Sequence, residues 1–223
     1  MRIRITFSKT GSLRYIGHLD LHQVWERTAR RAVLPLAYTQ GFHPGPRLQI
    51  ACALPLGISG RSELVDMFLD QESDGSSGEV PASPSSPEES CQRIRNALQS
   101  ASPPGLTILQ VEQVDERSPA LQTQVAAAEY AVIFRDETPL LEAGIAKILA
   151  AAVLPRQRRG KDYDLRPLIL LLEANPAGLR MILSAREGAT GRPEEVLLAM
   201  DIPPETTHIE RTRLIFKNEI ESP

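Results

Sequence analysis

Three arginines spaced for one face of a helix are the residues of this chain best suited to bind phosphate. Arg27, Arg30 and Arg31 fall at positions i, i+3 and i+4, a spacing that brings helical side chains together. A guanidinium group binds phosphate oxygens through paired hydrogen bonds. Arg2 and Arg4, on a segment of alternating basic and apolar residues, would extend the same surface. A helix face that is merely solvated remains the alternative.

A second basic segment lies in the other half of the chain. Arg156, Arg158, Arg159 and Lys161 flank Gly160. We expect a flexible basic loop there, which would follow a nucleic-acid backbone. Two basic clusters favour nucleic-acid contact more strongly than either cluster alone.

The segment 41–47 contains two glycines and two prolines, so it predicts a loop of defined shape. It carries Phe42, His43 and Arg47, and an exposed phenylalanine beside a histidine and an arginine favours ligand binding. An ordinary connecting loop is the alternative.

The histidines suggest two further kinds of chemistry. His18 and His22 are four residues apart and would share a helix face, with Asp20 and His43 as possible neighbours. Such a set could bind a metal, or His18 and His43 could act as general acid and base in RNA cleavage. Two histidines make an incomplete metal site, and His18 suits a helix start. We therefore expect no metal and no cofactor, and a non-catalytic protein more than an enzyme.

The composition limits the class of protein. The chain has 223 residues and a formal net charge of −3, but residues 1–47 alone carry +6. Cys52 and Cys91 are its only cysteines, too few for a disulfide framework or an iron–sulfur cluster. No apolar run is long enough to span a membrane, and the first residues lack a signal-peptide core. We expect a cytoplasmic protein that does not bind membranes.

The hydrophobic pattern predicts the same order of elements, β-α-β-β-α-β, in each half of the chain. In the first half we expect strands at 2–7, 48–54, 63–69 and 106–114 and helices at 18–33 and 91–101. In the second half we expect strands at 129–134, 165–173, 180–185 and 208–217 and helices at 139–151 and 193–199. The segment 71–90 is rich in Ser, Pro, Gly and acidic residues, which predicts a disordered insertion.

The predicted fold is therefore α+β, with two tandem ferredoxin-like domains and antiparallel sheets. The domains are expected at 1–118, including the acidic insertion 71–90, and at 125–220. A ferredoxin-like sheet is also the scaffold of the RNA-recognition motif, so we expect RNA rather than DNA as the ligand.

Several motifs resemble the radical-SAM-linked domain family, a domain of unknown function found alone or fused to radical SAM enzymes. The first is Arg14-Tyr15-Ile16-Gly17-His18-Leu19-Asp20, followed by Leu36-Ala37-Tyr38-Thr39-Gln40-Gly41-Phe42-His43-Pro44. The others are Ala53-Leu54-Pro55-Leu56-Gly57, Arg158-Arg159-Gly160-Lys161, Asp164-Leu165-Arg166-Pro167 and Gly191-Arg192-Pro193-Glu194-Glu195-Val196-Leu197. The resemblance implies a radical SAM partner.

The sequence thus favours an RNA-binding accessory protein that recruits substrate to a radical SAM enzyme. Two alternatives stay open. One is a metal-independent endoribonuclease or RNA-modifying enzyme that uses His18 or His43. The other is a protein–protein adaptor whose basic face binds an acidic partner.

Overall fold

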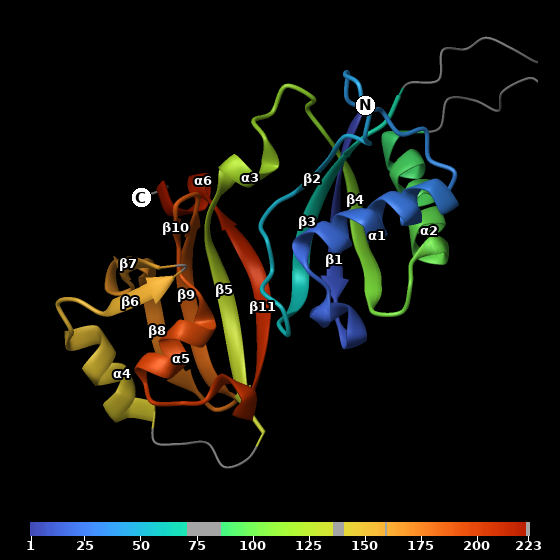
Figure 1. The fold of residues 1–223 in the computed structure, drawn as a ribbon. Helices are drawn as coiled ribbons and strands as arrows, with labels where there is room; N and C mark the ends of the chain where they lie inside the picture. The colour runs from blue at the N-terminus through green and yellow to red at the C-terminus, as the bar shows by residue number, and fades with distance from the viewer. Residues whose placement is uncertain (71–85, 136–140, 159, 222–223) are drawn as a thin grey trace, which may run out of the picture. The chain divides into compact units, whose positions relative to one another are not determined.

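The computed structural model describes residues 1–70, 86–135, 141–158 and 160–221 (Figure 1). The chain divides into two compact units. Unit 1 comprises Met1–Leu56 and Ser62–Gln122, and unit 2 comprises Gly57–Arg61 and Thr123–Pro223. The prediction of an α+β protein is confirmed, and within the described residues all pairs of strands but one run antiparallel. Within the described residues, no helix is both long and apolar enough to cross a membrane.

Unit 1 has the predicted element order. Its elements are β1 (Arg2–Lys9), the 3-10 helix η1 (Gly11–Tyr15), α1 (His18–Arg31), β2 (Leu48–Ile50), most of β3 (Ser59–Phe68), α2 (Pro87–Ala101) and β4 (Leu106–Val114). The strands of its sheet lie in the order β2-β3-β1-β4. β1 and β4 pair antiparallel along their full lengths.

The core of unit 1 lies between the sheet and both helices. Alternate residues of β1, namely Ile3, Ile5 and Phe7, are buried against α1 and α2, as the period of a strand requires. The Phe7 and Trp25 rings meet edge to face, with centroids 4.8 Å apart, a favourable aromatic geometry. Leu98 completes the core from α2. This packing fixes α1, and with it the side chains on its outer face.

α2 begins earlier than the sequence analysis predicts. The prediction placed residues 87–90 in the acidic insertion, but the helix starts at Pro87. Ser86 and Glu89 form a reciprocal capping box, and proline occupies the first helical position, both favourable at a helix start. The composition of this stretch obscured the cap. The rest of the predicted insertion, residues 71–85, lies outside the described residues.

Side chains of α2 occupy part of the outer edge of β4. Arg95 donates to the Leu109 carbonyl at 3.0 Å, and Gln99 accepts from the Ile108 amide at 2.7 Å. An uncovered strand edge invites pairing with other chains. These contacts therefore protect a strand that has only one sheet neighbour in unit 1.

Unit 2 contains the elements predicted for the second half, together with a hairpin, a two-residue strand and a short helix after the last strand that were not predicted. Its elements are β5 (Val125–Phe134), α4 (Leu141–Ala150), β6 (Pro155–Arg158), β7 (Lys161–Asp164), β8 (Ile169–Asn175), β9 (Gly178–Arg186), β10 (Ala189–Thr190), α5 (Pro193–Ala199), β11 (Thr207–Phe216) and α6 (Lys217–Glu221). The short helix α3 (Leu121–Gln124) precedes β5. The main strands lie in the order β8-β9-β5-β11. The first residues of β3 pair with β11, which explains why 57–61 belong to unit 2.

The predicted flexible loop around Gly160 is wrong, because β6 and β7 form an antiparallel hairpin there. Gly160 has a φ of +76°, which suits the tight connection between the two strands. The segment is therefore a shaped projection rather than a chain free to wrap a ligand.

Candidate nucleic-acid interface

A buried ion cluster uses two of the arginines predicted to bind RNA. Arg2 is 1% exposed and binds the fully buried Asp66 through Nε and Nη2, at 2.9 and 2.6 Å. It also donates to the carbonyls of Ser118 and Pro119. Arg4 binds the same carboxylate at 2.9 Å. The placement of Arg2 and Arg4 on an exposed surface is therefore corrected: both side chains serve the fold.

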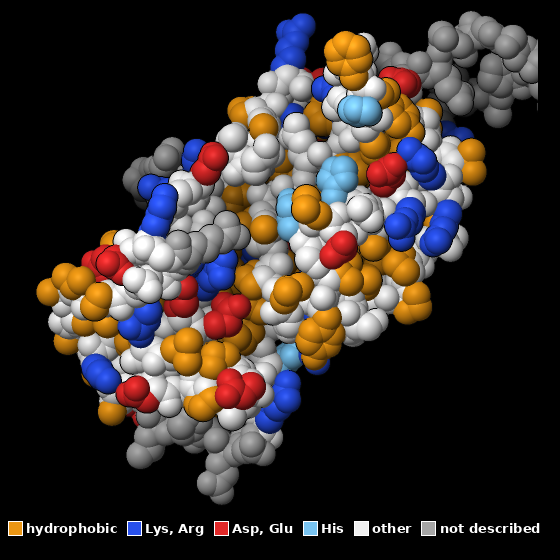
Figure 2. Space-filling view, in the orientation of Figure 1, with side chains coloured by type: hydrophobic (Ala, Val, Ile, Leu, Met, Phe, Trp, Pro, Cys, Tyr) orange, Lys and Arg blue, Asp and Glu red, His pale blue; other side chains and the backbone are white. Residues whose placement is uncertain are grey.

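The arginines of α1 lie where the sequence predicts, on the solvent side of the helix. Arg27, Arg30 and Arg31 are exposed, and Figure 2 shows Lys and Arg side chains gathered over α1. Arg30 pairs with Glu26 at 2.7 Å on the same helix. Arg27 and Arg31 lie one turn apart and form no ion pair within the described part of the chain, so their charges dominate this face.

The loop 38–47 is held at its base by backbone hydrogen bonds. Tyr38 and Pro46 form a β-bridge, and the Thr39 amide donates to the Gly45 carbonyl at 2.8 Å. Gly45 donates in turn to the Thr39 hydroxyl at 3.1 Å. Arg47 closes the base by donating its amide to the Ala37 carbonyl at 2.8 Å. The tip, residues 40–44, is exposed.

Arg47 also anchors the loop through its side chain. Its guanidinium carbon lies 4.1 Å from the centroid of the Phe68 ring, and that of Arg2 lies 5.3 Å away. Phe68 is buried, whereas Arg47 remains exposed. The ring thus fixes a cation at the foot of the loop, since guanidinium groups stack favourably on aromatic faces.

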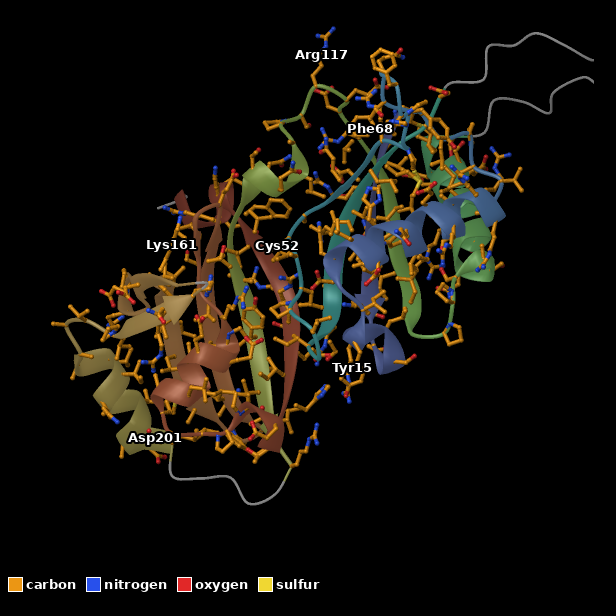
Figure 3. All side chains as sticks on the ribbon, in the orientation of Figure 1. Tyr15, Cys52, Phe68, Arg117, Lys161 and Asp201 are labelled. Carbon is orange, nitrogen blue, oxygen red and sulfur yellow. The ribbon has the colours of Figure 1, made fainter. Side chains whose placement is uncertain are left out.

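The loop follows the α1 arginines closely in the chain, and both belong to unit 1. The segment after α1 joins the end of β3, since Ala37 donates to Phe68 and Asp70 donates to Pro35. Arg31 and Pro35 are four positions apart in the chain, so their Cα atoms lie at most about 14 Å apart. Another aromatic side chain, that of Tyr15, stacks with Arg14. It lies at the other end of unit 1 from Phe68, to which the loop is anchored (Figure 3). Arg27, Arg30, Arg31, Phe42, His43 and Arg47 are thus exposed side chains of α1 and of the connection that follows it in unit 1.

Two of the histidines considered above lie on α1, and the third lies in the loop 38–47. His18 is the first residue of α1 and is exposed, His22 lies one turn later, and His43 lies in the loop. Within the described ranges, no group of three or more His, Cys, Asp or Glu side chains could hold a metal ion. A catalytic role for His18 or His43 stays a prediction.

The hairpin of unit 2 is tied to α5 by a cluster around Glu195. Arg158 binds the Glu195 carboxylate at 2.8 Å and the Thr190 carbonyl at 3.2 Å, and the Tyr163 hydroxyl donates a short hydrogen bond to the same carboxylate. Burial opposes the charge on Arg158, but the bond to Glu195 raises its pKa overall. The positive charge of Arg158 is thus matched within the fold.

The other predicted residues of this segment differ in exposure. Arg156 is half-buried, and its Nε is buried without a hydrogen-bond partner among the described residues. Lys161, labelled in Figure 3, is exposed, and Arg159 lies outside the described residues. Lys161 is therefore the member of the segment that the structure shows available to a ligand.

Replacing Tyr163 with Phe should remove a tyrosine that titrates unusually late. Burial first, and then the bond to Glu195, raises the pKa of Tyr163 from 10.0 to about 12. A raised pKa means that the fold stabilises the protonated hydroxyl, so this contribution is complete below pH 10 and is lost as the pH rises to about 12. The difference in tyrosinate absorbance between wild type and Tyr163→Phe should rise near pH 12. A difference centred at pH 10 would show that the hydroxyl is not held by Glu195.

The fold and the exposed residues of unit 1 define the class of protein to which this chain belongs. The chain is a two-unit α+β protein, and its first unit presents exposed arginines on α1 and an anchored loop that carries an exposed aromatic ring, a histidine and an arginine. It belongs to the family described as "Uncharacterized protein conserved in bacteria (DUF2344)", whose model matches residues 2–193. No curated protein matches the chain.

Proposed function

We propose that the chain is an RNA-binding accessory protein that recruits substrate to a radical SAM enzyme. The observation that carries the RNA part is that Arg27 and Arg31 on α1 and the loop tip with Phe42 and His43 are all exposed in unit 1. Arginines supply contacts to phosphate, and an exposed ring supplies contact to a base. The exposed Lys161 of the unit 2 hairpin adds a second point of contact.

The radical SAM part of the proposal is supported by the motif resemblance and by the cysteines. The chain has only Cys52 and Cys91, which lie on separate segments and are both half-buried. Burial raises the pKa of Cys91, which disfavours the thiolate that ligates iron. A chain with these two thiols would leave cluster chemistry to a partner. Affinity capture of the native protein tests this: a captured protein with an iron–sulfur cluster supports it, and capture of RNA alone contradicts it.

The proposal includes the duplicated ferredoxin-like architecture. It is supported by the order of the main strands, which is β2-β3-β1-β4 in unit 1 and β8-β9-β5-β11 in unit 2. In each unit the fourth main strand therefore lies beside the first, and the third separates the first from the second. Two such units would give the accessory protein two related surfaces.

Reversing the charge of Arg27 and Arg31 should weaken RNA binding at least tenfold. The double variant Arg27→Glu/Arg31→Glu removes two phosphate contacts and adds repulsion, and a tenfold loss corresponds to about 1.4 kcal/mol. Fluorescence anisotropy with a labelled RNA at low salt measures the loss. The salt dependence of binding should also become shallower, because fewer counterions are released.

The control for this experiment makes the same change of charge elsewhere. Arg93→Glu/Lys147→Glu alters two exposed cations on α2 and α4 and should bind almost as wild type does. Equal losses in both double variants would reduce the effect to net charge and contradict a defined surface.

Gel analysis of the recovered RNA belongs to the same experiment. Intact RNA agrees with a binding protein, whereas RNA cleaved by wild type but not by His43→Ala favours a nuclease.

A further inference from the structure

We infer that the loop 38–47 stacks an unpaired base on Phe42, so that the RNA ligand is single-stranded at this site. The inference rests on the proposed function and specifies its substrate class. Phe42 is fully exposed, although burying a phenylalanine side chain is worth about 2–3 kcal/mol. A ring left in solvent on an anchored loop is suited to a ligand that covers it.

The loop presents the ring on a fixed base. The bridge between Tyr38 and Pro46 and the hydrogen bonds between Thr39 and Gly45 tie its two arms together. The stack of Arg47 on Phe68 attaches the second arm to the end of β3. Little conformational entropy of the arms is therefore left to lose when a ligand binds, which favours affinity.

The surroundings of the ring match a nucleotide better than an apolar protein pocket. His43 and Gln40 are exposed beside it, and Arg47 is exposed at the foot of the loop. Arg31 is the last residue of α1, the helix whose end leads into this loop. A flat ring with cations close by suits a base with its phosphate, because stacking covers the ring and a guanidinium meets the anion.

The sheet of unit 1 does not offer an alternative stacking platform. Phe7 in β1 and Phe68 in β3 are its two aromatic residues in strands β1 to β4, and both are buried. Stacking of bases on the sheet, as in an RNA-recognition motif, would require exposed rings on those strands. Among the exposed rings of the described residues of unit 1, Phe42 is the most exposed, ahead of Tyr15 and Tyr38.

An exposed ring that stacks on a base distinguishes single-stranded RNA from duplex RNA. In a duplex both faces of an internal base are covered by its neighbours, so that only an unpaired base can stack on a protein side chain. Phosphate contacts from Arg27 and Arg31 are made with either form. The loop should therefore add affinity for single strands, while the helix contributes to both.

The test compares the binding of a labelled single strand of RNA with the binding of the same sequence as a duplex. A strand of about twelve nucleotides lies within the usual site size of such proteins. Phe42→Ala should weaken single-strand binding 5- to 50-fold, since a stacked base is worth about 1–3 kcal/mol, and leave duplex binding unchanged. Phe42→Leu, which keeps an apolar side chain without a π face, should behave like Phe42→Ala. The ring makes no core contact, so unchanged melting temperatures should show that both variants fold.

A spectroscopic variant gives a direct readout. Phe42→Trp should keep single-strand affinity, and its emission should be quenched by single-stranded RNA. The native Trp25 is fully buried, so a ligand should leave its emission unchanged. Absence of quenching at saturating RNA would overturn the inference.

The outcomes separate this inference from the function on which it rests. If Phe42→Ala binds both RNAs as wild type does while Arg27→Glu/Arg31→Glu loses affinity, stacking is wrong and RNA binding stands. If wild type binds neither RNA, the proposed function itself fails. If Phe42→Ala keeps RNA affinity but loses a captured protein, the ring inserts into a protein partner, which also overturns the inference.

Discussion

Asp66→Ala is expected to destabilise unit 1 by about 3–5 kcal/mol, the cost of leaving a buried cation without its partner. The substitution removes the carboxylate that binds both Arg2 and Arg4. The hydrogen-bond acceptors left to the Arg2 side chain would be the neutral carbonyls of Ser118 and Pro119. Solvent does not reach this side chain. Because Trp25 is the only tryptophan and lies in the core of unit 1, its fluorescence during denaturant unfolding measures the loss.

Two further variants show whether the buried charge is the cause. Glu26→Ala breaks the exposed pair with Arg30 and should cost less than about 1 kcal/mol. Adding Arg2→Met to Asp66→Ala removes the unpaired cation and should recover part of the stability. Equal losses in Asp66→Ala and Glu26→Ala, or no recovery in the double variant, would contradict the role assigned to the ion cluster.

The order of elements was predictable from the sequence because it depends on periodic patterns. Leu21, Trp25, Thr28 and Ala32 fall at helical spacing, which predicts that they form the inner face of α1, and the first three are buried. Ala32, also predicted there, is the half-buried C-cap, and Ala29 is buried instead. The periodicity of a helix identifies its inner face, but it does not fix the residue at which the helix ends.

The environment of Arg2 and Arg4 was not predictable from alternation alone. Alternating basic and apolar residues predict a strand with one solvated face, and nothing local reveals a carboxylate on another strand. One signal was present. Asp66 interrupts the apolar run of β3, and a buried charge in such a run requires a partner of opposite charge. The sequence therefore indicates that Asp66 needs a cationic partner. It does not indicate which cation that is, because Arg2 lies 64 positions away in the chain.

The exposed part of the candidate site was easier to predict than its anchoring. The exposure of Arg27, Arg31 and Phe42 follows from helix spacing and from the Gly- and Pro-rich loop. The stack of Arg47 on Phe68 depends on tertiary packing between segments that the sequence does not relate. The hairpin at Arg158 was missed for a different reason: four polar residues on either side of a glycine suggest a loop, although they also fit a two-stranded projection with polar faces.

Gly178→Ala is expected to destabilise unit 2 by about 3 kcal/mol or more, through a clash with the backbone. Gly178 begins β9 with a φ of +136°, a conformation nearly restricted to glycine. An added Cβ would lie 2.1 Å from the Val132 carbonyl oxygen, on a strand whose pairing with β9 includes Val132 opposite Leu179. Neither strand can move away without breaking hydrogen bonds of the central pair. Far-ultraviolet circular dichroism during denaturant unfolding measures the effect.

Gly188→Ala separates this clash from backbone strain. Gly188 also has a positive φ, +75°, but an added Cβ there would meet nothing within 4 Å. Its substitution should therefore cost only the strain of a left-handed residue, about 1–2 kcal/mol. The excess loss in Gly178→Ala then measures how closely β9 approaches β5. If the two variants lose equal stability, the close approach of the strands at Val132 is relieved at no cost, and the rigidity assigned to the centre of unit 2 is wrong.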